Sequence, residues 1–125
     1  MAFGATITIT VNSVAKVLNR INQDSYGSEF LLRSSTDEYR CRIRHSKETN
    51  PKGVDPLLRG MDRHNIEVTH TVFATATTPQ LVRQAYTVFR CSPGDDVTAV
   101  EQFVAGSTTF FNSSSVRADT LAWLS

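Results

Sequence analysis

The sequence predicts an α+β fold in which an antiparallel sheet is followed by two helices. Apolar and polar residues alternate with a period of two through most of the first ~90 residues, which is the pattern of strands with one buried face. After Ser92-Pro93-Gly94 the apolar spacing changes to that of a helix. Strands that precede the helices, rather than alternating with them, indicate an α+β layout.

The composition indicates a single domain, residues 1–125, with little overall charge. Thirteen basic and twelve acidic residues give a formal net charge of +1, so an anion site must come from a local arrangement of side chains. No apolar run reaches the roughly 18 residues of a membrane span, and a signal peptide is not evident. The two cysteines lack a CxxC pairing, which favours core residues in a reducing compartment. We predict no cofactor, no metal ion and no membrane partner.

The N-terminal part predicts three strands. Residues 5–11 alternate without a fault, and Asn12-Ser13 is a plausible turn. Residues 14–21 would return as the second arm of a hairpin, although a helical turn is also compatible with part of this arm. A polar turn at 22–25 then leads into a third strand at 26–33.

The next stretch, from Asp37 to His45, has a charged face and a mostly apolar face. One side carries Tyr39, Cys41, Ile43 and His45, and the other carries Arg40, Arg42 and Arg44. A row of guanidinium groups repels itself unless a polyanion neutralises it, and phosphate matches arginine through a bidentate fork. The alternative is a solvated edge strand that charge keeps soluble.

A long segment without period, residues 46–63, is predicted to be a loop with one short helical turn at Asp55 and Pro56. Residues 64–74 form the next predicted strand. A short connection at 75–80 leads to a last strand at 81–91.

Two helices are predicted after the sheet. Asp95 or Asp96 can cap the first helix, which ends at Asn112–Ser115, and a second covers residues 116–124. Their aromatic-rich apolar stripe is interpreted as core, with the helices covering one face of the sheet. The large apolar residues at the C-terminus, among them Trp123, would be buried better against a second subunit, so we expect a dimer.

The other face of the sheet is then left open, and it combines arginine, amide, hydroxyl and aromatic side chains. The candidate RNA-binding residues are Arg40, Arg42, Arg44, Asn65, Glu67, Thr69, Gln84, Tyr86 and Arg90. Phosphates can pair with the arginines, and an unstacked base can lie on Tyr86. An ordinary solvated sheet face is the alternative interpretation.

An enzyme is not favoured. The three histidines could supply acid and base, but alternation directs His45 and His70 to the apolar face. His64 and Glu67 lie on opposite faces of their strand, which argues against a shared metal site. The sequence shows no nucleophile constellation, phosphate-binding glycine loop or paired carboxylate motif.

Several segments, in this order and spacing, resemble the coat proteins of single-stranded RNA bacteriophages, the leviviruses. These segments are Ala15-Lys16-Val17-Leu18, Ile21-Asn22-Gln23-Asp24, Tyr39 to Glu48, Arg63 to Val68, Thr78-Pro79 and Val82 to Tyr86. The resemblance implies an N-terminal hairpin, a five-stranded antiparallel sheet and two C-terminal helices that interlock with a partner subunit. It also implies a virion protein, assembled in the host cytoplasm, whose dimers build an icosahedral shell with T=3 symmetry around genomic RNA.

In the family the sheet faces the genome, and in several members it binds an RNA hairpin and represses replicase translation. The resemblance therefore assigns RNA contacts to the arginine strand and a stacking role to Tyr86. The alternative is a small cytoplasmic dimeric RNA-binding regulator that forms no shell. Asp55 and Asp62 could hold a divalent ion between subunits, although a solvated loop is the simpler expectation.

Overall fold

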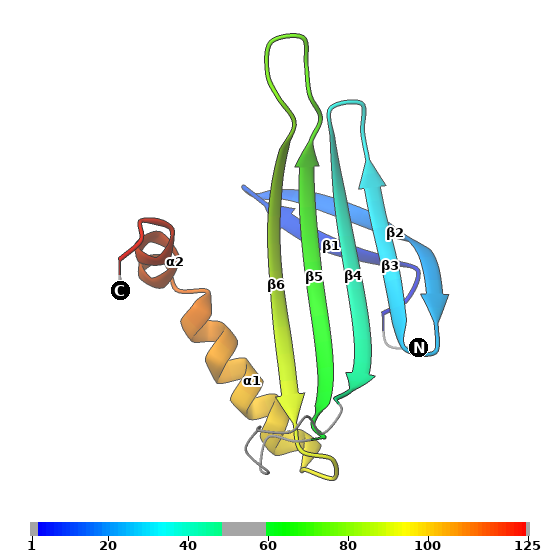
Figure 1. The fold of residues 1–125 in the computed structure, drawn as a ribbon, viewed down its shortest axis with the longest axis vertical. Helices are drawn as coiled ribbons and strands as arrows, with labels where there is room; N and C mark the ends of the chain where they lie inside the picture. Colours follow the sequence, from blue (N-terminus) through cyan, green and yellow to red (C-terminus); the bar gives the residue numbers. More distant parts are fainter. Residues whose placement is uncertain (1–2, 49–59, 125) are drawn as a thin grey trace. The chain divides into compact units, whose positions relative to one another are not determined.

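The computed structural model describes residues 3–48 and 60–124 of the chain (Figure 1). The chain divides into two compact units, a sheet unit (Met1–Arg90) and a helical unit (Cys91–Ser125). The predicted helical turn at Asp55 and Pro56 lies outside the described residues. The packing of the helices on the sheet, expected from their order, stays a prediction.

The sheet unit consists of one six-stranded sheet in which the strands lie in sequence order. The strands are β1 (Thr6–Val11), β2 (Val14–Asp24), β3 (Gly27–Arg33), β4 (Asp37–Lys47), β5 (Asp62–Val72) and β6 (Leu81–Cys91). The resemblance implied a sheet of five strands, whereas the sheet has six. The additional strand is β1, which joins the sheet because it pairs with β2 along its whole length.

Most predicted strand boundaries are confirmed, and the differences arise from pairing between strands. β2 continues to Asp24, so the turn to β3 falls later than predicted. β4 and β5 stay paired as far as Lys47 and Asp62, which shortens the predicted loop at 46–63 from both ends. Alternation alone could not show this, because the extra residues are polar on both faces.

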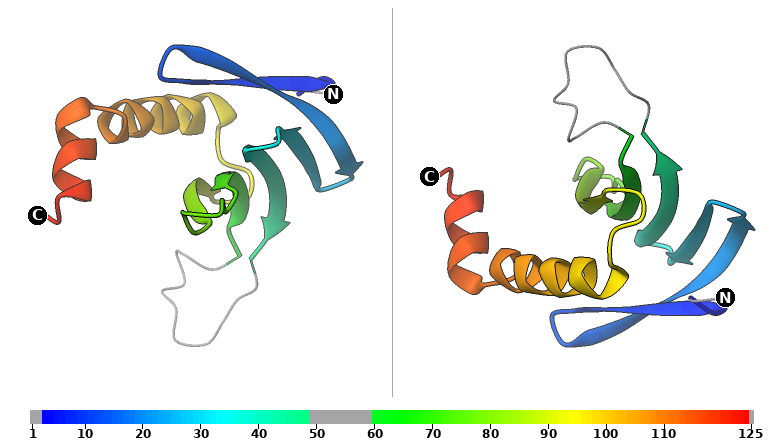
Figure 2. Two further views of the ribbon diagram at one scale, coloured as in Figure 1. Left: turned by 90° about the horizontal axis from the view of Figure 1, so that it is seen from above. Right: turned by 90° about the horizontal axis from the view of Figure 1, so that it is seen from below.

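The N-terminal hairpin bends across the apolar face of the sheet. Its two-residue turn places Asn12 and Ser13 at positive φ (50° and 64°), which suits the twist of the flanking strands. The register of β2 against β3 shifts between Arg20 and Asn22, and a bulge of this kind bends a strand. In Figure 1 and Figure 2 the hairpin therefore leaves the plane of β3 and β4 and crosses behind them.

The core lies between this hairpin and the sheet. The buried apolar residues are Leu18, Phe30, Tyr39, Cys41 and Ile43, with Ile7, Ile9, Leu32, Ile66 and Val68 packed partly buried against them. Leu18 from the hairpin and Phe30 from β3 are both fully buried, with 0% of their surface exposed. The hairpin thus covers part of the apolar face, a role that the sequence interpretation gave to the helices.

A polar network closes the turn between β3 and β4. The Ser34 hydroxyl donates to Asp37 Oδ1 (2.7 Å), and His70 Nε2 lies 3.0 Å from Asp37 Oδ2. Arg83 Nη1 lies 3.1 Å from His70 Nδ1, so His70 is held as the Nε2–H tautomer, and its ring stacks on Tyr39 at 4.1 Å. The hydrogen bond from Ser34 and the contact with His70 lower the pKa of Asp37 below its ordinary value.

The helical unit contains α1 (Val97–Phe111) and α2 (Ser114–Leu121). Asp96 caps α1, because its side chain accepts a hydrogen bond from the backbone N–H of Thr98. Ser113 caps α2 in the same way, so the helix break falls at Asn112 and Ser113, within the predicted interval. Neither helix is long and apolar enough to cross a membrane.

Taken by itself, the helical unit leaves its apolar stripe exposed, so the interpretation of this stripe as core stays a prediction. Neither α1 nor α2 contains a buried residue. Phe103, Leu121 and Trp123 keep 74%, 82% and 95% of their surface exposed. Two short helices have too little mutual contact to bury large side chains, so this stripe needs another surface to cover it.

The first prediction concerns the contact between the hairpin and the sheet. Leu18→Ala should lower the free energy of unfolding by about 2–5 kcal/mol, because it leaves a cavity beneath the hairpin. Urea denaturation of the dissociated protein measures this loss. The adjacent Val17→Ala is the control, since Val17 is 45% exposed and its truncation should cost much less. Equal losses in the two variants would contradict the core assignment.

The second prediction concerns the Asp37 network. Because folding lowers its pKa, the ionised Asp37 carboxylate stabilises the fold above its unfolded pKa of about 3.9, and this contribution is lost as the pH falls through the lower folded value. Asp37→Asn should cost on the order of 1 kcal/mol at pH 7, and its difference from wild type should shrink towards pH 3. Denaturation at both pH values measures this, with Asp119→Asn on an exposed position of α2 as control. A difference that does not change with pH would exclude the carboxylate as its cause.

Candidate nucleic-acid interface

All the predicted RNA-binding residues lie on one face of the sheet, which we call the polar face. In the register of β4 and β5, Arg40, Arg42 and Arg44 stand opposite Thr69, Glu67 and Asn65. Gln84 Nε2 donates to Glu67 Oε1 (2.9 Å), so Gln84 lies on the polar face. Because side chains alternate along a strand, the other even-numbered residues of β6 lie on this face too. Tyr86 and Arg90 therefore belong to it as well. The core lies on the opposite face, as the alternation predicted.

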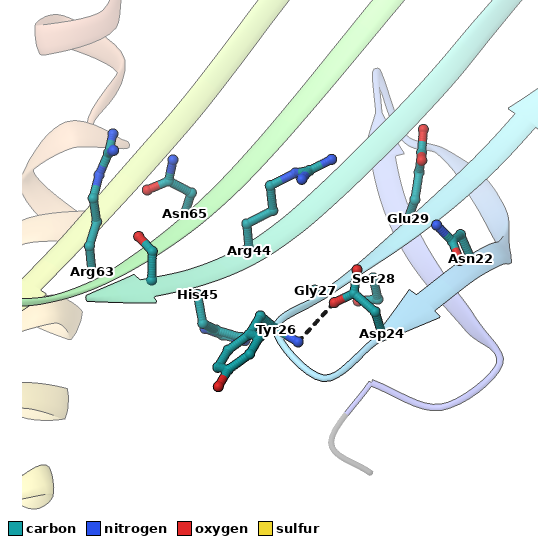
Figure 3. Close-up of a pocket in the computed structure, with 11 residues that line it drawn as sticks. Asn22, Asp24, Tyr26, Gly27, Ser28, Glu29, Arg44, His45, Arg63 and Asn65 are labelled. Carbon is teal, nitrogen blue, oxygen red and sulfur yellow. Dashed lines mark hydrogen bonds between the residues drawn. The ribbon is translucent and has the colours of Figure 1, made fainter. Parts of the chain in front are cut away.

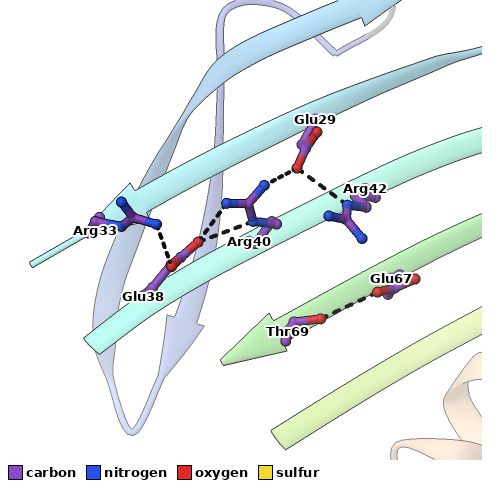
Figure 4. Close-up of polar contacts among 7 residues, drawn as sticks. All are labelled: Glu29, Arg33, Glu38, Arg40, Arg42, Glu67 and Thr69. Carbon is purple, nitrogen blue, oxygen red and sulfur yellow. Dashed lines mark hydrogen bonds and ion pairs between the residues drawn. The ribbon is translucent and has the colours of Figure 1, made fainter. Parts of the chain in front are cut away.

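The arginine row is partly neutralised by carboxylates of the same face (Figure 4). Glu38 accepts hydrogen bonds from Arg33 Nη2 (2.9 Å) and from Arg40 Nη2 (2.8 Å). Glu29, from β3, bonds both Arg40 and Arg42. Arg40 has a carboxylate on either side, so its charge is neutralised within the chain. Repulsion at this position therefore gives no reason to expect an external polyanion.

The pKa values of these groups follow from the pairing. Hydrogen bonds from Arg33 and Arg40 lower the pKa of Glu38. Partial burial tends to raise the pKa of Glu29, but hydrogen bonds from Arg40 and Arg42 outweigh it and lower the value. The same contacts, to Glu38 and Glu29, raise the pKa of Arg40. These carboxylates stay ionised at neutral pH and hold the arginine side chains in place.

The polar face carries an arginine without a carboxylate partner at the end where β2 turns into β3. Arg44 is exposed there and makes no salt bridge or side-chain hydrogen bond to another described residue. Arg44, Asn65 and Arg63 line a hollow of about 320 Å³ and point to the same side, away from His45 (Figure 3). Asn65 Oδ1 is buried in this region without a hydrogen-bond partner. The hollow combines the guanidinium groups of Arg44 and Arg63 with the carboxylates of Asp24 and Glu29.

The candidate residues of β6 differ in how available they are. The Tyr86 ring is 65% exposed and free to stack. Gln84 is engaged with Glu67 and Thr69. Arg90 forms two hydrogen bonds of 2.6 Å with Glu48, so it anchors the end of β4 to β6 and its charge is already paired.

Sequence reasoning missed several residues of this face because it did not know which residues pair across strands. The missed residues are Asn22, Glu29, Arg33, Glu38 and Arg63. The alternation of Glu29 and Arg33 on one side of β3 was visible in the sequence. Their position beside the arginines depends on the register of β3 against β4, which turn lengths alone did not determine.

The chemistry of the face suits binding rather than catalysis. Within residues 3–48 and 60–124, no group of three His, Cys, Asp or Glu side chains is placed to hold a metal ion. Both cysteines are free, and burial raises the pKa of the Cys41 thiol, which makes it unreactive.

Comparison with known proteins identifies the family of the chain. A family model described as the coat protein of phage phiCb5 matches residues 4–92. A search of curated proteins finds no match. The virus-like particle of bacteriophage AVE019 has a similar fold, with a TM-score of 0.69 and 8% identity over 92% of this chain and 91% of that chain. The virus-like particle of bacteriophage ESE058 gives a TM-score of 0.66 and 15% identity over 92% of each chain.

The structural likeness, at these identities, concerns the fold alone, while the family match covers most of the chain and all six strands. The resemblance to RNA phage coat proteins is thereby confirmed. The chain belongs to the family of the phage phiCb5 coat protein, and is a structural component of a virion rather than an enzyme.

Proposed function

We propose that dimers of this coat protein assemble in the host cytoplasm into a closed T=3 icosahedral shell around phage genomic RNA. The polar face of the sheet binds the RNA, and binding of one RNA hairpin represses replicase translation. The observation that carries the proposal is the placement of the arginines, Asn65 and Tyr86 together on the face opposite the core.

The edge strand β6 supports assembly. It is 11 residues long and ends the sheet, so one side of its backbone has no partner strand among residues 3–48 and 60–124. A long uncovered edge presents a row of N–H and C=O groups to another chain. Pairing with the β6 of a second copy would satisfy these groups and continue the polar face across the dimer.

The helices support the same dimer. Phe110, Leu121 and Trp123 expose 62%, 82% and 95% of their surface. Residues of this size rarely stay in water in a group, and such groups mark interaction surfaces. A second copy is the occupant that the proposed shell supplies, and docking on it would complete the core that one chain lacks.

The arginines of the polar face differ in how readily they can bind phosphate. Arg44 is exposed and unpaired within the described residues, so it can bind phosphate without first losing a carboxylate. Arg40 is held between Glu29 and Glu38, so its charge is already neutralised by carboxylates of the same face. A base can stack on Tyr86 while phosphates lie along Arg42 and Arg44.

The alternative function, a cytoplasmic regulator that stops at the dimer, uses the same face. The family match favours the shell, since a coat protein must close a particle. Electron microscopy and mass measurement of the expressed full chain distinguish the two. We expect uniform closed particles that contain RNA, whereas dimers alone under all assembly conditions would exclude the shell.

A charge-removal pair tests the RNA face. Arg44→Ala should weaken RNA binding by the dissociated protein and reduce the slope of log K against log salt by about 1. Fluorescence anisotropy at several salt concentrations measures both quantities.

Lys47→Ala is the matched control for this test. It removes one positive charge from the same strand, on the opposite face, where the side chain is 84% exposed. An equal loss of binding in the two variants would show that net charge, rather than the polar face, drives the interaction.

A further inference from the structure

We propose that His45 and His64 form a binding site for a late first-row transition-metal ion such as Cu²⁺, Ni²⁺ or Zn²⁺. The two residues stand directly opposite each other on β4 and β5, on the face opposite the arginines. Their Nδ1 atoms lie 2.9 Å apart, and the ring centroids are 5.0 Å apart with the ring planes at 67°. The proposal does not rest on RNA binding, because the two histidines lie away from the polar face.

The convergence of the two Nδ1 atoms is the central observation. Without a metal ion, one Nδ1 must carry a proton and donate it to the other. When both imidazoles are neutral with the proton on Nε2, two lone pairs are directed into the same space and repel each other. A cation placed between them removes this repulsion and accepts both lone pairs, which is how imidazole binds divalent metals.

The spacing also limits the coordination geometry. Metal–imidazole bonds are about 2.0–2.1 Å long, so two nitrogen ligands at 90° lie about 2.9 Å apart. The observed separation of 2.9 Å matches this cis arrangement, which is typical of Cu²⁺ and Ni²⁺. A tetrahedral Zn²⁺ would need a separation of about 3.3 Å, which small rotations of exposed rings can provide.

The surroundings leave room for the remaining ligands. His45 and His64 line an open hollow of about 210 Å³ together with Tyr26, Lys47 and Asp62. Asp62 precedes His64 by two residues and shares its face, and its Oδ1 is buried without a hydrogen-bond partner. Lys47 Nζ is 4.0 Å from that oxygen, which is too far for a hydrogen bond. Water would complete the coordination shell, and the Asp62 carboxylate can orient one such water.

The remaining histidine provides an internal contrast. His70 contacts Asp37 through Nε2 and Arg83 through Nδ1, so both of its nitrogens are already engaged. It has no free lone pair for a metal ion while this network is intact. The three histidines of the chain thus divide into one convergent pair and one engaged residue.

Binding would clamp β4 to β5 beyond the end of the core. The last buried apolar residue of β4 is Ile43, and His45 is the next residue on the same face. A metal ion that binds the native pair and not the separated histidines of the unfolded chain shifts the equilibrium towards the native state. The expected consequence is a rise in the melting temperature with the concentration of metal ion.

Titration of the purified full chain with Cu²⁺ and with Ni²⁺, followed by calorimetry and Cu²⁺ electron paramagnetic resonance, tests the site. Wild type should bind one equivalent with two nitrogen ligands, and the metal should raise its melting temperature. His64→Gln and His45→Gln should each lose this equivalent. His70→Gln should retain it, and circular dichroism checks that each variant is folded.

The result that would overturn the proposal is equally specific. A wild-type protein that binds no equivalent beyond that of His64→Gln has no site at this pair. Retention of binding in His64→Gln together with its loss in His70→Gln would place the metal elsewhere. Particle formation and RNA content of His64→Gln should match wild type, so failure of the metal site leaves the proposed coat function untouched.

Discussion

Strand β4 determines the character of the sheet because it separates apolar from charged side chains between its two faces. Tyr39, Cys41 and Ile43 enter the core, while the arginines between them stay on the polar face. β4 pairs with β3 on one side and with β5 on the other, so its alternation constrains the register of both neighbours. A slip of one residue would bring guanidinium groups into the core without partners, at a cost of several kcal/mol.

The carboxylates on the polar face reduce the electrostatic repulsion between the arginines of β4. Glu29 and Glu38 hold Arg40 between them, so closely spaced cations coexist on one strand before any RNA is present. The pairing is uneven along the strand, since Arg44 has no such partner among the described residues. Arg44 lines a hollow together with Arg63, Asp24 and Glu29, and its guanidinium group is the one in the row that can bind an anion without first losing a carboxylate.

The sequence predicted the strands, the cap of α1 and the face of every candidate residue, because alternation and capping are local signals. It did not predict the partners of Arg40 and Arg90, which are Glu29 from β3 and Glu48 directly after β4. It also did not predict that the hairpin covers part of the apolar face, since nothing local shows that the bulge between Arg20 and Asn22 turns the hairpin over the core. Strand register and strand bending depend on contacts between distant segments, so they are difficult to predict from a single sequence.

The distribution of buried residues connects the fold to assembly. Every fully buried apolar side chain of the described chain comes from the sheet unit, and the helical unit contributes none. A chain of 125 residues normally buries more of its surface than this small core provides. In the proposed dimer, the exposed aromatic residues of α1 and the open edge of β6 would be covered, and folding and association would then stabilise each other, as in obligate dimers. A subunit that completes its core only on meeting another copy is suited to a role in which it acts only as part of an assembly.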